Sequence, residues 1–339
     1  MALASALLKR YFVATASSIF ANDNRSNKAD GYADVEAGIN NKKTPLGVVK
    51  DDSGKLEQLS AWDSVQFERK GDKKHGKPVV AQDWLDAFQE AVENEYRVVE
   101  KVKEGRMGKA GERSKSSRLC VDFNVSHQAG LVVLVGTTEP DVEVGVDVTC
   151  VDERGDMESI AKRGFGSWVD VYEQVLSPEE VRDLKAWVGD ETVHALESGQ
   201  EGDCLSPKSV IKDKVRRFYT LWACKEAYLK MTGDALLATY VQKLEFEGFR
   251  APKPAEDERD GPWGEKVTGT VPKIAGELDR NTEIGIQAFE KNYIMVTAIR
   301  SRHGRVDGNA QFSFLDIDDI VALAIRQRHE NRASNANNL

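Results

Sequence analysis

The segment WACKEAYLKMTGDALL, residues 222–237, constrains the fold of this chain more than any other segment. Trp222, Glu226 and Lys230 recur every four residues, so a helix would place them on one face, with Lys225 at its margin. A glycine then ends the helix. Because carboxylates bind divalent cations and lysines bind phosphate oxygens, this face suits a metal-assisted reaction on a phosphate ester. The alternative is a solvated helix held by ion pairs four residues apart.

A second constraint on the fold is the segment from Val142 to Val148, in which valine occupies every other position. This alternation is typical of a β-strand. Its valines face one way, and the opposite face carries Asp147 and Thr149. A carboxylate among valines costs free energy unless it accepts hydrogen bonds or binds a cation. Asp147 is therefore either a hydrogen-bond acceptor near the end of its strand or a metal ligand.

Anion-binding candidates lie upstream of this strand. Residues 119–125 and 131–135 predict a hairpin joined by SHQAG, with His127 at its tip. His127 is either a turn histidine or, with Ser126 and nearby backbone amides, a phosphate contact. Lys77, in a Gly-Lys-Pro turn, is a weaker candidate for meeting an anion.

The periodicities along the chain predict an α+β protein built of two similar halves. The expected helices are residues 2–14, 81–104, 156–174, 178–187, 212–232 and 316–328. The expected strands are the two hairpin strands and residues 62–67, 76–80, 142–148, 265–271, 282–290 and 293–300. Polar stretches at 21–60, 101–118 and 189–211 are expected to be loops or insertions.

Bulk properties exclude some classes of protein. The net charge of −9 opposes a dedicated nucleic-acid binder, and the basic segment 101–118 has no interleaved aromatic residues. No apolar run reaches the ~18 residues of a membrane span. The four cysteines show no metal-binding spacing and suit reduced thiols. We therefore expect a cytoplasmic, monomeric protein that binds neither membranes nor nucleic acids.

The motifs GKP, FNVSH, GVDVT and WACKEAYLK occur in an order that resembles the Sfp-type 4′-phosphopantetheinyl transferases. The segments GVDVTCVDER and FYTLWACKEAYLKMTGDALLA are similar to the fungal branch of that family. The resemblance implies their pseudo-dimeric fold, in which each half is a small antiparallel sheet packed with helices. The expected units are residues 1–142, with insertions at 21–60 and 81–118; residues 143–300, with the metal site; and a partly disordered extension, 301–339. The first unit is expected to be incomplete at its start.

The resemblance also implies the reaction. The family moves 4′-phosphopantetheine from coenzyme A to a serine of an apo carrier protein and releases 3′,5′-ADP, with Mg²⁺ as cofactor. By similarity, Asp147 and Glu226 are the metal ligands, and Glu226 or a metal-bound water takes the serine proton. The implied cofactor-binding residues are Lys225 and Lys230 for the phosphates and Lys77, Ser126 and His127 for the 3′-phosphate or ribose. The implied catalytic set is Asp147, Glu226 and Lys230.

Two departures from the family leave an alternative open. Thr149 stands where bacterial relatives have a third carboxylate, so a water is expected to complete the metal site. The chain also begins about fifty residues later than relatives do, which raises the alternative of an inactive protein that binds coenzyme A or carrier proteins. Carriers of fatty acid, polyketide, nonribosomal peptide and aminoadipate reductase systems all remain candidate partners.

Overall fold

The computed structural model describes residues 2–26, 46–50, 56–60, 65–70, 76–90, 119–188, 207–234, 236, 238–255, 261–302, 312–322 and 325. The expected loops at 101–118 and 189–206 lie outside the described residues. Helices and antiparallel sheets are mixed along the chain, as an α+β fold requires. The division into two similar halves stays a prediction.

The helices are α1 (Ala2–Ser26), α4 (Asp156–Arg163), α5 (Phe165–Val169), α6 (Pro178–Ala186) and α8 (Pro207–Thr232), with residues 82–90 and 317–322 also helical. The strands before the chain midpoint are β1 (Leu46–Lys50), β2 (Leu56–Ser60), β3 (Phe67–Lys70), β4 (Lys77–Val80), β5 (Asp122–Gln128), β6 (Leu131–Thr137) and β7 (Val142–Cys150). The later strands are β8 (Leu244–Glu247), β9 (Trp263–Ile274), β10 (Glu277–Leu278), β11 (Thr282–Phe289) and β12 (Tyr293–Ser301).

Several predicted boundaries were wrong. Residues 21–60 include the end of α1 and a β1–β2 hairpin, so they are not one continuous loop. The strand expected at 62–67 begins only at Phe67. Gly164 divides the helix expected at 156–174, because its φ of 80° is not helical. Helix α8 begins five residues before position 212, at Pro207.

The β5–β6 hairpin is tighter than its sequence predicted. Its turn consists of Ala129 and Gly130 alone, both with positive φ, as a type I′ turn requires. Ser126, His127 and Gln128 therefore belong to strand β5, and His127 pairs with Val132 rather than lying at the tip. Because successive side chains of a strand point to opposite faces, Ser126 and Gln128 share one face and His127 the other.

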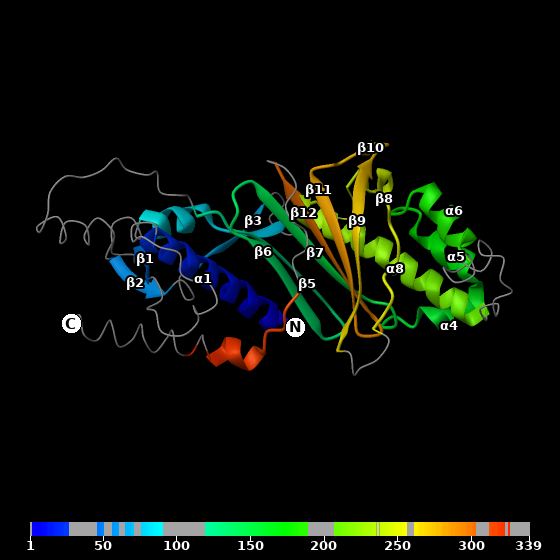
Figure 1. Ribbon diagram of the computed structural model, residues 1–339, viewed down its shortest axis with the longest axis horizontal. Helices are drawn as coiled ribbons and strands as arrows, with labels where there is room; N and C mark the ends of the chain where they lie inside the picture. The colour runs from blue at the N-terminus through cyan, green and yellow to red at the C-terminus, as the bar shows by residue number, and fades with distance from the viewer. Residues whose placement is uncertain are drawn as a thin grey trace, which may run out of the picture.

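The largest sheet has six strands, in the order β10, β9, β11, β12 and β7, with β8 also paired to β9. Figure 1 shows this sheet near the centre, with α8 running beside it toward α4, α5 and α6 on the right and α1 on the left. Helix α8 packs against β7 and β12. The approach is close at Gly145 of β7, where an added Cβ would lie 2.2 Å from the Ala227 carbonyl oxygen and 2.5 Å from the Met231 nitrogen.

Strand β7 is the last strand of this sheet, and side chains of β5 complete its hydrogen bonding. The N–H groups of Val144, Val146 and Val148 donate to Asp122 Oδ2 at 2.8 Å, Asn124 Oδ1 at 3.0 Å and Ser126 Oγ at 3.3 Å, respectively. Each pair is separated by 22 residues, so the two strands run in the same direction. Alternate side chains of β5 therefore take the place of a backbone ladder and fix β5 against β7.

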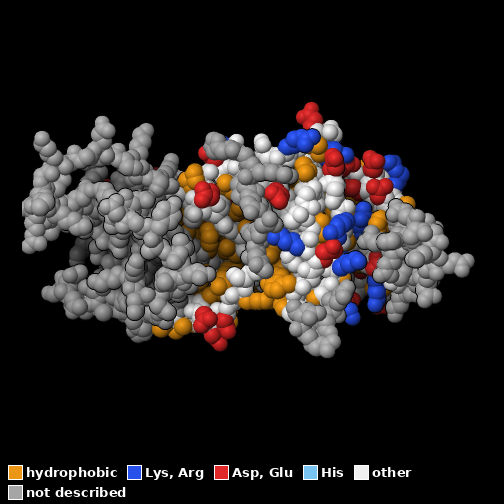
Figure 2. Space-filling view, in the orientation of Figure 1, with side chains coloured by type: hydrophobic (Ala, Val, Ile, Leu, Met, Phe, Trp, Pro, Cys, Tyr) orange, Lys and Arg blue, Asp and Glu red, His pale blue; other side chains and the backbone are white. Residues whose placement is uncertain are grey.

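The end of the chain connects distant elements. Phe314 lies 5.2 Å from the Trp263 ring and 5.6 Å from the Phe289 ring, on strands of the large sheet. Ile320 is buried in a cluster that includes Val13 of α1 and Phe88. In Figure 2, basic and acidic side chains are mixed over the right-hand part of the visible face, so the net negative charge is not concentrated there. Among the described residues, no helix has the length and apolar character needed to cross a membrane.

Candidate active site

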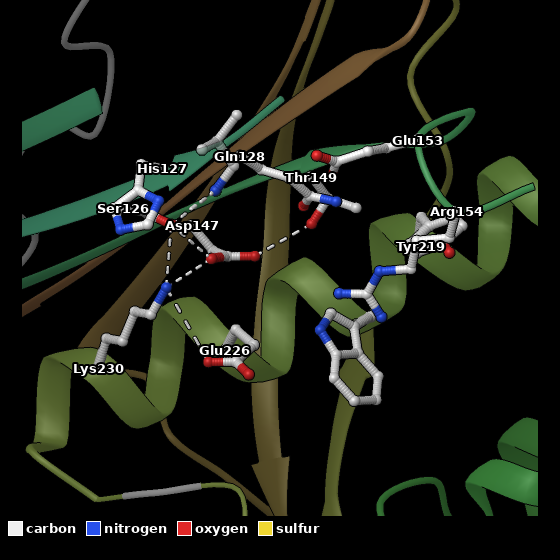
Figure 3. Close-up of a pocket in the computed structure, with 12 residues that line it drawn as sticks. Ser126, His127, Gln128, Asp147, Thr149, Glu153, Arg154, Tyr219, Glu226 and Lys230 are labelled. Carbon is white, nitrogen blue, oxygen red and sulfur yellow. Dashed lines mark hydrogen bonds and ion pairs between the residues drawn. The ribbon is translucent and has the colours of Figure 1, made fainter. Parts of the chain in front are cut away.

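A polar pocket of about 230 Å³ lies where β5, β7 and α8 meet. It is lined by Ser126, His127, Gln128, Asp147, Val148, Thr149, Glu153, Arg154, Tyr219, Trp222, Glu226 and Lys230. Figure 3 shows Asp147 and Glu226 between Lys230 on one side and Arg154 on the other. The structure therefore brings together five of the predicted site residues, from segments about a hundred positions apart.

Asp147 is buried, and its carboxylate accepts hydrogen bonds from neighbouring side chains. Its Oδ1 accepts hydrogen bonds from Ser126 Oγ at 2.8 Å and from Lys230 Nζ at 2.6 Å. Its Oδ2 accepts one from Thr149 Oγ1 at 3.1 Å. These hydrogen bonds offset the cost of burying the carboxylate.

Glu226 lies one helical turn before Lys230, and their charged atoms are 4.0 Å apart. Burial raises the pKa of Glu226 and the Asp147 carboxylate raises it further, against the opposing charges of Lys230 and Arg154. Lys230 thus holds two carboxylates at once, from β7 and from its own helix. A pocket with two close carboxylates favours a cation between them.

The two predicted residues of β5 differ in their contacts. Ser126 is buried, donates to Asp147 and accepts a hydrogen bond from Lys230 at 3.0 Å. His127 is exposed and lines the pocket from the same strand. Ser126 therefore organises the carboxylate cluster, whereas the His127 ring faces solvent.

Lys225 is not in the pocket, contrary to the expectation that it binds phosphates. Its side chain is fully buried, and its ammonium lies 3.0 Å from Glu180 of α6 and donates to the carbonyls of Val241 and Leu244. Burial lowers the pKa of Lys225, and burial likewise raises that of Glu180. Phosphate binding by Lys225 does not fit this structure, because its ammonium is already committed on the far side of α8.

Lys77 is also outside the pocket. Its buried ammonium donates to Asp122 Oδ2 at 2.5 Å and to the Val144 carbonyl at 2.8 Å. It thereby joins β4 to β5 and β7, and the anion contact expected from the Gly-Lys-Pro turn does not fit its position. Glu180 has a local role as well, since it forms a capping box with Ser177 at the start of α6.

The sequence analysis missed four polar or aromatic residues of the pocket: Gln128, Glu153, Arg154 and Tyr219. Gln128 was missed because the sequence assigned it to a loop. Assigned to a strand, it would have been predicted on the same face as Ser126. Tyr219 lies seven residues before Glu226, on the same helical face. Glu153 and Arg154 lie three and four residues after the end of β7. Their charge and their position just beyond the strand that carries Asp147 could have marked them as pocket residues.

The donor set of the pocket fits a hard cation such as Mg²⁺. Asp147 and Glu226 supply carboxylate oxygens, and Thr149 adds a hydroxyl. Burial and, next, the neighbouring Asp147 carboxylate raise the pKa of Glu226, and a divalent cation would stabilise this carboxylate pair. Glu153 also lines the pocket, but within the described residues no group of three or more His, Cys, Asp or Glu side chains is placed to hold a metal.

Several known proteins are similar to this chain. Residues 143–268, which include β7 and α8, match the model of the 4′-phosphopantetheinyl transferase superfamily. The chain is 33% identical to a 4′-phosphopantetheinyl transferase of Aureobasidium melanogenum over 297 residues, which cover 78% of each protein. It is 36% identical to 4′-phosphopantetheinyl transferase A of Aspergillus fumigatus over 53% of this chain and 56% of that protein. For the transferase NpgA of Emericella nidulans, the identity is 33% over 53% of each chain.

The mixed helix-and-sheet fold and the similarity to these proteins place the chain among the transferases. The chain belongs to the 4′-phosphopantetheinyl transferase superfamily, in its fungal Sfp-type branch.

Proposed function

We propose that this protein transfers 4′-phosphopantetheine from coenzyme A to a serine of an apo carrier protein and releases 3′,5′-ADP, in a reaction that depends on Mg²⁺. The observation that supports this most is the arrangement of Asp147 and Glu226 around Lys230 in one pocket. Both carboxylates lie within the segment that matches the superfamily.

The pocket residues have distinct roles in this reaction. Lys230 binds phosphate oxygens of coenzyme A, because its ammonium is partly exposed and lies among the carboxylates. Glu226, or a water beside it, accepts the proton of the carrier serine. The serine oxygen then attacks the phosphorus that bears the pantetheine arm, and 3′,5′-ADP leaves. Ser126 and Thr149 hold the Asp147 carboxylate in place.

Asp147 and Glu226 would hold the Mg²⁺ ion, with Thr149 or a water completing its oxygen ligands. When bound, the ion neutralises charge that develops on the diphosphate. His127, on the exposed side of β5, contacts the 3′-phosphate or the ribose. Candidate acceptors are carrier domains of fatty acid, polyketide, nonribosomal peptide and aminoadipate reductase systems.

The test is to incubate the protein with Mg²⁺, coenzyme A and an apo carrier protein and to weigh the carrier by mass spectrometry. We expect a mass gain of one phosphopantetheine. The rate should fall at least about 100-fold in Asp147→Asn and Glu226→Gln, which keep the shape of each side chain. Glu179→Gln, which removes an exposed carboxylate from α6, is the matched control and should keep the wild-type rate.

Two outcomes would contradict the proposal. Coenzyme A binding without any mass gain on several classes of carrier would favour the inactive binding protein. A mass gain that persists at full rate in both carboxylate variants would show that the chemistry takes place elsewhere.

A further inference from the structure

The pocket contains hydrogen-bond donors that lack acceptors. The side-chain nitrogen of Gln128 is buried and, within the described residues, has no hydrogen-bond partner. Arg154 is exposed at the pocket wall and forms no hydrogen bond or ion pair with any described residue. A buried donor without an acceptor destabilises the folded protein, so its presence in a pocket points to a ligand that supplies one.

Several other polar groups of the pocket are already engaged. Lys230 donates to Asp147 and Ser126 and lies 4.0 Å from Glu226. Tyr219 donates its hydroxyl to Asp156. Lys225, the other lysine of the signature segment, is buried on the opposite side of α8. Gln128 and Arg154 are therefore donors of this pocket that no described residue satisfies.

We propose that Arg154 and Gln128 bind the diphosphate of coenzyme A, the part of the substrate that reacts. This assignment rests on the proposed function and names the residues that recognise the substrate in it. Neither residue is among the cofactor-binding residues expected from the sequence.

Chemistry and position both favour the diphosphate. A guanidinium donates two parallel hydrogen bonds to phosphate oxygens and keeps its charge at every physiological pH. Figure 3 shows Arg154 across the pocket from Lys230, with Asp147 and Glu226 between them. An anion that contacts both cations would lie beside the carboxylate pair, where the proposed function places the reacting phosphorus. Gln128 shares the face of β5 that carries Ser126, which contacts Asp147, whereas His127 points to the other face.

Isothermal titration calorimetry with two ligands tests the assignment. Coenzyme A and dephospho-coenzyme A share the diphosphate and differ only in the 3′-phosphate. We expect Arg154→Ala to weaken binding of both ligands about tenfold and Gln128→Met to weaken both a few-fold. Arg163→Ala removes a similar charge from the exposed end of α4 and should bind both ligands like the wild type.

Thermal unfolding provides a readout that a merely structural role would not give. Because Gln128→Met removes a buried donor that has no partner, the ligand-free variant should be as stable as the wild type or more stable, while its affinity falls. Loss of affinity for coenzyme A alone would assign these residues to the 3′-phosphate and overturn the proposal, as would unchanged affinity in both variants. A wild-type chain that binds neither ligand and modifies no carrier would overturn the proposed function, and this assignment with it.

Discussion

Two lysines five residues apart on α8 have opposite environments. Lys230 reaches the pocket, where it lies 2.6 Å from Asp147. Lys225 is fully buried and lies 3.0 Å from Glu180, with two backbone carbonyls as further acceptors. Five residues correspond to about 500° of rotation on a helix, so the two ammonium groups leave the axis in directions well over 90° apart. One lysine can bind substrate, while the other holds α6 and the 241–244 segment against α8.

A double-mutant cycle tests the structural role of Lys225. Lys225→Met leaves Glu180 buried without its partner, and we expect the free energy of unfolding in urea to fall by about 3–5 kcal/mol. Glu180→Gln should destabilise for the same reason, and the double variant should lose less than the sum of the two. Lys162→Met, an exposed control on α4, should change little. Additive losses would show that the pair is not coupled.

For individual residues, the sequence predicted which charged groups share a face better than it predicted the residues that pack around them. Asp147, Glu226 and Lys230 were found because strand alternation and helical spacing fix the direction of their side chains. Lys225 lies at the margin of the helical face, so its spacing allows the side chain to point either into the pocket or toward α6. Its ion pair with Glu180 of α6 fixes the second direction. That packing is a long-range property, and no local pattern contains it.

Among the elements, β7 and α8 approach each other most closely at Gly145. An added Cβ there would lie within 2.5 Å of two backbone atoms of α8, and backbone atoms cannot rotate away. Glycine at this position therefore sets the distance between the strand that carries Asp147 and the helix that carries Glu226. The separation of the two carboxylates depends on it.

Gly145→Ala should destabilise the protein by about 3 kcal/mol, at the upper end of the usual cost of overpacking. The transfer rate should also fall, because the two carboxylates would be moved apart. Gly166→Ala in α5 is the control, since the nearest atom to its added Cβ is Lys185 Cε at 3.8 Å and alanine favours the helix. Unfolding monitored by circular dichroism checks both variants. Equal stability of Gly145→Ala and the wild type would rule out this close approach.

Element types were predicted more reliably than their boundaries. The alternation at 142–148 and the strands near 282–290 and 293–300 were confirmed, as was the cap of α6 at Ser177. The extent of the β5–β6 hairpin was not, because a two-residue turn with Ala129 at positive φ has no clear signal in SHQAG. Because of that error Gln128 was not predicted as a pocket residue, since the direction of a side chain in a loop cannot be predicted.

Across the whole molecule, a charge network joins segments that are far apart in sequence. Arg300 of β12 contacts Asp279 at 2.9 Å, the Tyr228 hydroxyl of α8 at 2.6 Å and Glu143 of β7 at 3.5 Å. Glu143 in turn pairs with Lys70 of β3 at 3.3 Å. Burial alone would raise the pKa of Asp279, but hydrogen bonds from Thr282, Tyr228 and Arg300 lower it below its ordinary value of 3.8.

This network predicts a pH dependence of stability. Because the folded protein lowers the pKa of Asp279, its contribution is present above the unfolded value and is lost as the pH falls through the folded value. Asp279→Asn should therefore be less stable than the wild type by about 1–2 kcal/mol near pH 6, and the difference should shrink toward pH 3. Asp183→Asn, on the exposed face of α6, is the control. A difference between Asp279→Asn and the wild type that does not change with pH would refute the argument.

The arrangement of the whole chain was the least predictable level. Sequence patterns indicated an α+β protein and the resemblance indicated its family. Neither predicted that Phe314 would pack on Trp263 while Ile320 joins the cluster around Val13 and Phe88. Such contacts depend on where the last segment crosses the fold, which follows from tertiary packing rather than from local periodicity.

The β5 side chains that accept hydrogen bonds from β7 also affect how readily the protein aggregates. An outer strand with open N–H groups invites a second chain to add to the sheet, which is a common start of aggregation. Here Asp122, Asn124 and Ser126 already occupy those groups along β7, so an intruding strand would have to displace three hydrogen bonds first. Protection from aggregation and the shape of the site thus depend on the same three residues.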